Sequence, residues 1–422
     1  MATATGDLVD LPENSDGRDW LGQWNSSVTS YYALVGASAL LLALGLTMVL
    51  SATTIESIAA GQSPYAEGLR QAQFFLLGLP VMIIASRLPV TFFKKIAWPA
   101  LFGAMLLQSL TLVPAFSRTA GTRAGWIVIG GLNMQPAEAG KVALALWLGL
   151  VLSRKQHLLH DWKHLLLPGV LGALAIIGLV MAGDDLTSAF IFIALAMGAL
   201  FVAGTPLRYL ALGAGAGAVV MVSRYVLGSS TRITRIMATF DPYCDPLGVC
   251  FQMRHGMFAL GSGGMFGVGL GGSREKWRYL PEAHNDFIFA IIGEELGLMG
   301  TLTVLVLFVV LGLAMTRVIR RHPDPFVKIT TAAIFCWIIA QAFINIGVVI
   351  GLFPVIGLPL PLISAGGSAL ITTMLGLGIV ISFARSEPGA YEALTARGNV
   401  VRRTLAVLGR GSRVNRRVSH AK

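Results

Sequence analysis

One short stretch of the chain carries side chains that could do acid–base chemistry. Asp286 stands directly before an apolar run, and Glu282 and His284 lie just ahead of it. A positioned carboxylate can act as a general base toward a hydroxyl group, for example that of a sugar. It can equally be an acid at the start of a helix, stabilised by the helix dipole. The residue types alone leave both alternatives open.

The region before Asp286, from 228 to 285, is rich in charge and in glycine. It holds six basic and four acidic residues: Arg232, Arg235, Arg254, Arg274, Lys276, Arg278, Asp241, Asp245, Glu275 and Glu282. Its glycines between 261 and 272 allow a backbone to approach a ligand closely. A structureless loop of this length is unusual unless it is functional. A basic, flexible loop suits an anionic headgroup, and a loop that is merely solvated by its charges is the alternative.

A helix is expected to begin at Asp286. Pro281 stops regular structure, and Asn285 is a residue type that caps helices. The predicted helix carries Glu294 and Glu295 and reaches Gly297. The two glutamates are expected either to contribute to the site or only to brace the preceding loop.

The amino-acid composition indicates whether the helices that carry these groups lie in water or in lipid. The chain has 422 residues, of which 55% are hydrophobic and 13% charged, and its mean hydropathy is +0.72. Soluble domains have about 25% charged residues, so the chain is expected to be embedded largely in lipid. Three cysteines exclude a disulfide-rich scaffold, and no Cys or His cluster suggests a metal site.

Ten apolar runs are long enough to span a bilayer. They lie at 32–52, 72–86, 96–113, 137–153, 165–182, 186–204, 209–227, 299–316, 329–351 and 366–384. The predicted fold class is an all-α polytopic membrane protein with ten transmembrane helices. The loop at 228–285 then lies between the seventh and eighth helices, outside the cytoplasm. Residues 1–31 form a polar tail that does not resemble a signal peptide, 32–384 the membrane domain, and 385–422 a basic tail.

Positive charge in the short loops predicts that both termini are cytoplasmic. On that side the short loops hold Arg87, Lys94, Lys95, Arg154, Lys155, Lys163, Arg208, Arg317, Arg320, Arg321 and Lys328. The outer short loops hold only Arg70, Arg118 and Arg123. The basic C-terminal tail is expected to bind anionic membrane lipids, or else a cytoplasmic partner. The net charge of +11 is therefore attributed to the membrane, and nucleic acid is not an expected partner.

Cys244 and Cys250 flank a Pro-Gly turn in the outer loop. An oxidising exterior makes a small disulfide between them plausible. Cys336 lies within the ninth span and is interpreted as a packing residue.

Several long motifs run along nearly the whole membrane region. They are Gly269-Leu270-Gly271, Leu280 to Ala290, Gly293 to Gly297, Gln135-Pro136-Ala137-Glu138 with Lys141, Asp241-Pro242 with Phe251-Gln252, and Pro354 to Ser368. Together these motifs resemble those of the SEDS family of membrane glycosyltransferases. The sequence departs from the family pattern at Ala137, Asp184, Asn285 and Ala365, and Gly121 to Trp126 is a loose match that leaves the role of Arg123 in doubt.

The resemblance implies a peptidoglycan glycosyltransferase that joins lipid II into glycan strands and releases undecaprenyl pyrophosphate. It implies Asp286 as the catalytic acid group, acting as general base. Charge makes Arg232, Arg235, Lys276 and Arg278 the candidates for the pyrophosphate, unless they only hold the loop in place. A divalent cation such as Mg²⁺ or Mn²⁺ could share that task, but no carboxylate cluster indicates a metal site.

The remaining candidates for substrate binding are Glu282, His284, Glu138 and Lys141. Glu138 and Lys141 are three residues apart on one helix face, and ionisable groups in a membrane are expensive. They are expected either to lie near the substrate or to satisfy each other. The segment from Ser364 to Ser368 is expected to serve close helix packing.

The resemblance also implies a class B penicillin-binding protein, a transpeptidase, as partner. The two polar tails favour the division branch of the family over the elongation branch, with other division proteins as partners at the septum. A lipid II flippase is the main alternative, but a transporter is expected to place its charges near the bilayer midplane. A division scaffold that needs no Asp286 is a further alternative.

Overall fold

Each of the ten predicted apolar runs coincides with a helix in the computed structural model. The model describes residues 28–113, 125–129, 132–228, 230–241, 243–245, 247–277, 279–390 and 392–395. Its helices in the membrane region are α2 (Thr29–Ala59), α3 (Ala66–Ala85), α4 (Val90–Leu110), α5 (Pro136–Arg154), α6 (Trp162–Leu165) followed by η2 (Leu166–Val170) and α7 (Leu171–Ala182), α8 (Leu186–Val202), α9 (Leu207–Gly228), α12 (Ile288–Arg321), α13 (Pro325–Val349) and α14 (Gly367–Arg385). A short turn, η1 (Gln156–Leu158), follows α5. The predicted tails lie almost entirely outside the described residues.

The all-α, multi-pass class is confirmed. Within the described residues seven helices, α2, α3, α4, α5, α12, α13 and α14, are long and apolar enough to cross a membrane. The helices α7 and α8 and the apolar part of α9 are shorter. That all ten runs span the bilayer stays a prediction.

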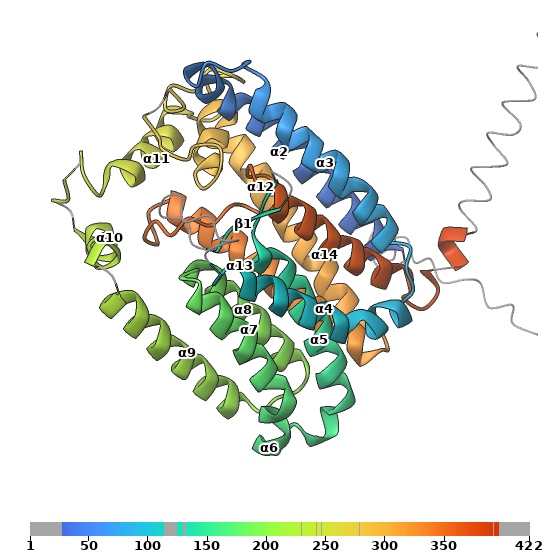
Figure 1. Ribbon diagram of the computed structural model, residues 1–422. Coiled ribbons are helices and arrows are strands. Elements are labelled where there is room, and N and C mark those ends of the chain that lie inside the picture. Colours follow the sequence, from blue (N-terminus) through green and yellow to red (C-terminus); the bar gives the residue numbers. More distant parts are fainter. Residues whose placement is uncertain are drawn as a thin grey trace, which may run out of the picture.

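The helix α13 lies at the centre of the bundle, against α5, α8 and α12 (Figure 1). Two glycines let neighbouring helices approach it. A Cβ atom on Gly149 of α5 would collide with Thr330, and one on Gly198 of α8 would collide with Cys336. Small residues at such crossings allow the close packing by which helices associate in lipid. The predicted packing role of Cys336 agrees with this contact.

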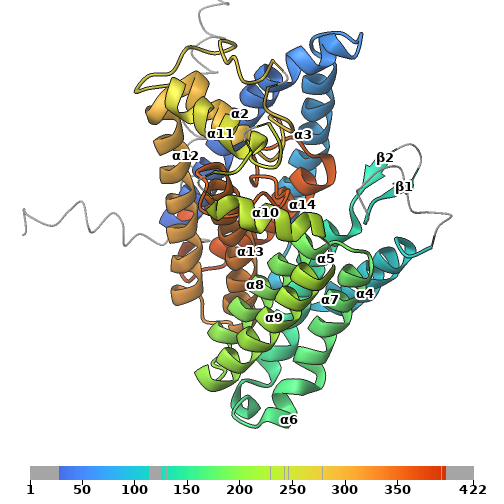
Figure 2. The ribbon, with the colours of Figure 1, turned by 90° about the vertical axis from the view of Figure 1, so that its left-hand side faces the viewer.

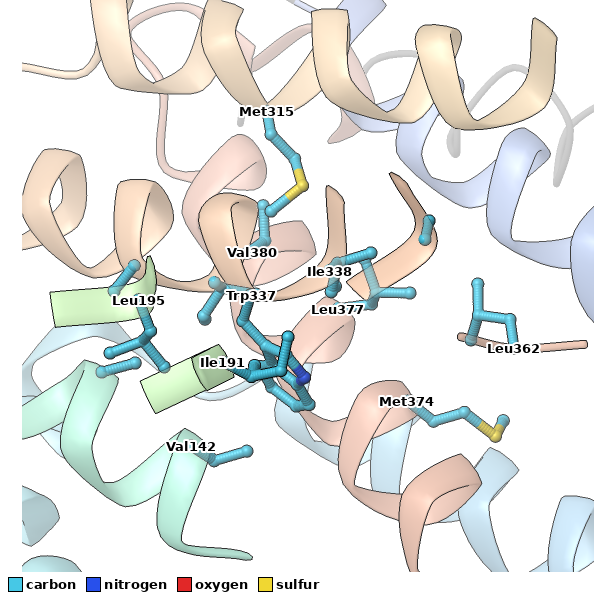
Figure 3. Packing of buried hydrophobic residues seen from close by; sticks show 14 of the residues in the cluster. Val142, Ile191, Leu195, Met315, Trp337, Ile338, Leu362, Met374, Leu377 and Val380 are labelled. Atoms are coloured by element: carbon cyan, nitrogen blue, oxygen red, sulfur yellow. The ribbon is translucent and has the colours of Figure 1, made fainter. Parts of the chain in front are cut away.

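The core around α13 is apolar and built from several helices. Figure 3 shows Trp337 of α13 surrounded by side chains that include Ile191 of α8 and Leu377 of α14. Trp337 is fully buried. In contrast, much of the surface of α3 and α4 is exposed apolar side chain, as expected for helices that face lipid.

The long segment between α9 and α12 is not structureless, in contrast to the prediction. It contains α10 (Ser230–Phe240) and α11 (Phe251–Ser262), which Figure 2 shows beyond the end of α9. The turn between them is closed by a disulfide between Cys244 and Cys250, whose Cα atoms are 6.1 Å apart. The predicted disulfide is thus present in the structure.

A short hairpin precedes α5 and was not predicted. Its strands are β1 (Ile127–Ile129) and β2 (Leu132–Met134), which pair antiparallel with Val128 opposite Asn133. Three-residue strands fall below the length at which alternation can be recognised in a sequence.

The side assigned to the cytoplasm shows two cross-helix contacts. Lys94 forms a 2.6 Å salt bridge with Asp324, and Arg385 donates a 2.9 Å hydrogen bond to the carbonyl oxygen of Ser86. Loops predicted to share one face of the membrane therefore lie at the same end of the bundle.

Candidate functional site

The segment that contains Asp286 is a series of turns, not the start of a helix. Residues 281–287 are irregular, and α12 begins at Ile288 with Phe287 as its N-cap residue. The prediction that Asn285 caps the helix and that Asp286 opens it is therefore wrong. The carbonyls of Asn285 and Asp286 accept from Ser364 and Asn345 instead, and the amides of the first turn of α12 donate to Phe287.

Three hydrogen-bond donors from α13 and from the loop between α13 and α14 hold this segment. The Ala365 amide donates to the carbonyl oxygen of His284 at 3.0 Å, and the Ser364 hydroxyl donates to that of Asn285 at 2.6 Å. The side-chain amide of Asn345 donates to the carbonyl oxygen of Asp286 at 2.8 Å. The backbone beneath the candidate carboxylate is therefore fixed by α13 and by the loop after it.

The Asp286 side chain is half-buried and lies against that same loop. A Cβ atom on Gly357 would be 3.4 Å from its Oδ2 atom. Gly357 has φ +76°, a conformation that glycine adopts without strain. The loop backbone can thus pass close beside the carboxylate without covering it with a side chain.

His284 is bound to the outer end of α2. Its Nδ1 atom is 2.9 Å from a carboxylate oxygen of Glu56. Burial lowers the pKa of His284, but the hydrogen bond to Glu56 and the charges of Glu56, Glu282 and Glu67 outweigh it and raise the pKa above 6.5. The imidazole thereby links α2 to the Asp286 segment, and the raised pKa favours its protonated form.

A cavity of about 570 Å³ lies beside the segment, between α10 and α11. Arg235 is exposed and lines it, as do Gln252 and Cys250. The wall also includes Pro281 and Val355. Gln252 donates a 2.9 Å hydrogen bond to the carbonyl oxygen of Pro281, which connects α11 to the Asp286 segment. Of the predicted pyrophosphate ligands, Arg235 is the one whose described position faces an open site.

Two other predicted ligands cannot be placed. Arg278 lies outside the described residues, and for Arg232 only the backbone in α10 is described.

Lys276 occupies a buried position that favours a structural role. Its ammonium group is 2.8 Å from a carboxylate oxygen of Glu295 and 3.2 Å from the hydroxyl of Ser51. Ser51 in turn donates to Glu295 at 2.7 Å. The Lys276 and Glu295 side chains are 4% and 0% exposed, so the positive charge is balanced inside the protein. This pair attaches the outer loop to α2 and α12.

The glycine-rich segment approaches a helix backbone, whereas the sequence suggested close approach to a ligand. The helix α12 is broken at Gly297, with φ +68°. The amides of Val268 and Gly269 donate to the carbonyl oxygens of Glu294 and Glu295 at 2.9 and 3.1 Å. The Leu298 amide donates to the Gly264 carbonyl at 2.9 Å. The loop backbone therefore supplies hydrogen bonds that the broken helix lacks.

Glu294 stabilises the same loop. This agrees with the second of its two predicted roles, bracing of the loop. It is 2% exposed and accepts hydrogen bonds from the hydroxyl of Ser273 and from the amide of Arg274, the latter at 2.8 Å.

Glu138 and Lys141 form a buried network on α5. Their charged groups are 2.8 Å apart, and their side chains are 6% and 1% exposed. Lys141 also donates to the side-chain oxygen of Gln341 at 3.2 Å and lies 4.8 Å from the ring centroid of Trp337. The pair is thus satisfied internally, and it joins α5 to α13 below the loop that holds Asp286.

The described residues contain no group of three His, Cys, Asp or Glu side chains that could hold a metal ion. The described residues therefore do not form a metal site made of protein side chains alone.

Comparison with known proteins places the chain in a family. The family model for cell cycle proteins of the FtsW, RodA and SpoVE group matches residues 32–388. The chain belongs to the FtsW, RodA and SpoVE family.

Individual members of the family are similar over most of their length. A Mycobacterium tuberculosis protein named probable peptidoglycan glycosyltransferase FtsW is 39% identical over 397 residues, covering 94% of this chain and 73% of the relative. One chain from a peptidoglycan synthase complex, solved to show how polymerisation and crosslinking are coordinated, is 28% identical with a TM-score of 0.67, covering 84% and 97%. The Thermus thermophilus rod shape determining protein RodA is 27% identical with a TM-score of 0.62 and the same coverage.

Sequence reasoning on this FtsW, RodA and SpoVE family member missed residues that hold the site. Asn345 is a polar residue inside an apolar run, a pattern that predicts a function or a buried partner, and that signal was available. Ser364 was assigned to packing, and Ser51 and Glu56 carry no sequence signal because their partners are more than 200 positions away.

Proposed function

We propose that this chain is a peptidoglycan glycosyltransferase that polymerises lipid II at the outer face of the cytoplasmic membrane. Family membership and the names of its relatives support the activity. The observation that carries the site assignment is the Asp286 carboxylate, half-buried in a turn outside the helices, on a backbone segment whose carbonyls accept three hydrogen bonds. A general base needs such a fixed position.

The reaction we propose is a displacement at a sugar carbon. The 4-hydroxyl of one lipid II disaccharide attacks the anomeric carbon of another, and Asp286 takes the hydroxyl proton. The new bond is the oxygen–carbon bond of the glycan. The bond from the anomeric carbon to the phosphate oxygen breaks, and its electron pair leaves with undecaprenyl pyrophosphate.

Arg235 is our candidate for stabilising the leaving pyrophosphate. It lines the cavity whose wall includes Pro281 and Val355, and these belong to the same two segments as Asp286 and Gly357. A cation here binds the pyrophosphate of lipid II already in the bound substrate, which lowers KM, and it also favours departure of the charged leaving group. Lys276 acts in this proposal by fixing the loop, since its charge is paired with Glu295.

We further propose the cellular setting. The partner is a class B penicillin-binding protein, supported by the similarity to a chain of a peptidoglycan synthase complex. The excess of basic residues in loops at one end of the bundle supports cytoplasmic termini, with the C-terminal tail on anionic lipids. Similarity to relatives named FtsW supports a role in division, at the septum with other division proteins.

The test is polymerisation of labelled lipid II by the full chain with its cognate transpeptidase. Wild type is expected to make glycan strands, and Asp286→Asn is expected to be slower by a factor of about 10² to 10⁴, the usual contribution of a general base. Asp184→Asn is the matched control, because Asp184 is exposed in a turn with φ +57°, which asparagine also tolerates.

Equal product from wild type and Asp286→Asn would overturn the site assignment. An absence of product from wild type and partner would overturn the enzymatic proposal and favour a flippase or a scaffold.

A further inference from the structure

Three consecutive carbonyl oxygens under the candidate base are each bound by a separate donor. The carbonyls of His284, Asn285 and Asp286 accept from Ala365, Ser364 and Asn345. Residues 281–287 have no regular secondary structure, so no helix or strand holds them. The position of the Asp286 backbone therefore depends on these donors.

Asn345 uses both hydrogens of its side-chain amide in this arrangement. One is donated to Asp286 at 2.8 Å and the other to the carbonyl oxygen of Leu358 at 2.7 Å. Both acceptors are carbonyl groups, so the orientation of the amide is determined by its partners. The residue is 1% exposed. It joins the end of α13 to two separate segments.

Ser364 makes the same kind of bridge. Its hydroxyl donates to the Asn285 carbonyl at 2.6 Å and accepts from the Leu360 amide at 2.7 Å. Removal of this hydroxyl would leave one acceptor and one donor without their partner in a buried place, and each unsatisfied group is unfavourable.

The loop that carries Ser364 is itself fixed to two helices. Gln341 of α13 donates to the carbonyl oxygen of Pro359 at 2.9 Å. Gln71 of α3, which is 5% exposed, accepts from the Gly366 amide at 3.1 Å. The chain of contacts therefore runs from rigid helices through the loop to the Asp286 segment.

We propose that Asn345 and Ser364 are positioning residues that set the place of the Asp286 carboxylate for catalysis. This inference rests on the proposed function of Asp286. A reacting group must be held within about 0.5 Å of its productive position, and a misplacement of about 1 Å can reduce the rate roughly 100-fold. Neither side chain touches the reacting atoms, so both act through the backbone of Asp286.

The experiment compares initial rates of lipid II polymerisation by the full chain with its cognate transpeptidase. Ser364→Ala removes the hydroxyl, and Ser364→Thr keeps it. Asn345→Leu removes both donors at similar volume without adding charge. Thr373→Val is the matched control, because Thr373 is 3% exposed and its hydroxyl bonds only to its own helix, at Ala369.

Positioning residues are expected to affect kcat and not KM. Ser364→Ala and Asn345→Leu should lower kcat by about 10- to 100-fold with KM within about twofold, measured per folded molecule after thermal unfolding of each sample. Ser364→Thr should restore most of the rate. Thr373→Val should keep the wild-type kcat and change the unfolding temperature little, because the Ala369 carbonyl still accepts the helical hydrogen bond of residue 373.

Three outcomes would overturn the inference. The first is a wild-type kcat in folded Ser364→Ala and Asn345→Leu. The second is an equal loss of kcat in Thr373→Val, which would indicate general loosening of the core. The third is full activity of Asp286→Asn in the same assay, which would overturn the proposed base and with it the need to position it.

Discussion

The Asp286 segment and the α10–α11 region border the same cavity but are held in different ways. The Asp286 segment is bonded to buried side chains of α13 and its following loop. The α10–α11 region has a small apolar cluster of its own, Ala238 with Cys244 and Cys250, and strongly exposed side chains such as Tyr243 at 94%. Figure 1 shows it beyond the end of α9, at the edge of the bundle.

The difference indicates a division of labour. A reacting carboxylate must stay in one place, and the fold surrounds its backbone with buried hydrogen-bond donors, which form rigid and specific networks. The wall that carries Arg235 has fewer connections to the core, and such regions open at low free energy. This arrangement suits a polymerase, whose product must shift after every disaccharide added. Changes to the first region should therefore alter stability or kcat, and changes to the second should alter KM.

The largest effect is expected from breaking the buried pair that attaches the loop to the core. Lys276→Met leaves Glu295 buried without its cation, which should destabilise the protein by about 3 to 5 kcal/mol. Tryptophan fluorescence during thermal unfolding in detergent would measure the change. The double variant Lys276→Met with Glu295→Leu should recover much of the loss, because it removes both charges. A single variant as stable as wild type would contradict the structural role.

Arg235→Gln should weaken substrate binding and leave the fold intact. Loss of one charged contact to a phosphate is worth about 1.5 kcal/mol, or roughly a tenfold higher KM for lipid II. Arg274→Gln serves as the control, because Arg274 is exposed in the same segment between α9 and α12 but does not line the cavity. A lower unfolding temperature with unchanged KM would assign Arg235 to the scaffold.

Loss of the disulfide should also affect KM more than stability. Cys244→Ser with Cys250→Ser frees the turn between α10 and α11, so that the Arg235 wall becomes less ordered. We expect KM to rise about two- to fivefold, since ordering a few side chains costs about 1 kcal/mol. Mild reductant should reproduce the change in wild type. An unaltered KM in both cases would show that the core alone holds this wall.

The smallest effect is expected from titration of His284. Its pKa is raised by Glu56 and the neighbouring carboxylates, so protonated His284 stabilises the fold below about pH 6.5. This contribution should be lost as the pH rises through the raised pKa. Because Glu56 is largely exposed, the loss should be below about 1 kcal/mol. Unfolding temperatures from pH 6 to pH 9 should fall in wild type and less so in Glu56→Gln. Parallel curves would exclude the pair as the cause.

The sequence predicted the helices well because hydrophobic runs report directly on the membrane environment. It placed α13 and α14 within a few residues, and it located the carboxylate of the site through a long motif. It failed at the start of α12, where the local signals for a cap at Asn285 were overridden by donors from Ser364 and Asn345. Those contacts join residues about 60 to 80 positions apart, and no local pattern contains them.

The sequence could not decide which of the candidate basic residues bind substrate, for a similar reason. Charge alone could not separate Arg235, which lines a cavity, from Lys276, which is paired with Glu295. Both are basic residues of the predicted loop 228–285, and only the folded path of the backbone decides which one is buried.

The broken helix at Gly297 has a consequence for how the protein is made. The carbonyls exposed by the break are bonded to Val268 and Gly269, which are synthesised before α12. A helix with open backbone groups is unfavourable in lipid, so the final position of α12 depends on the segment that contains Val268 and Gly269. In the topology that the sequence predicts, export of that segment and integration of α12 are therefore coupled steps.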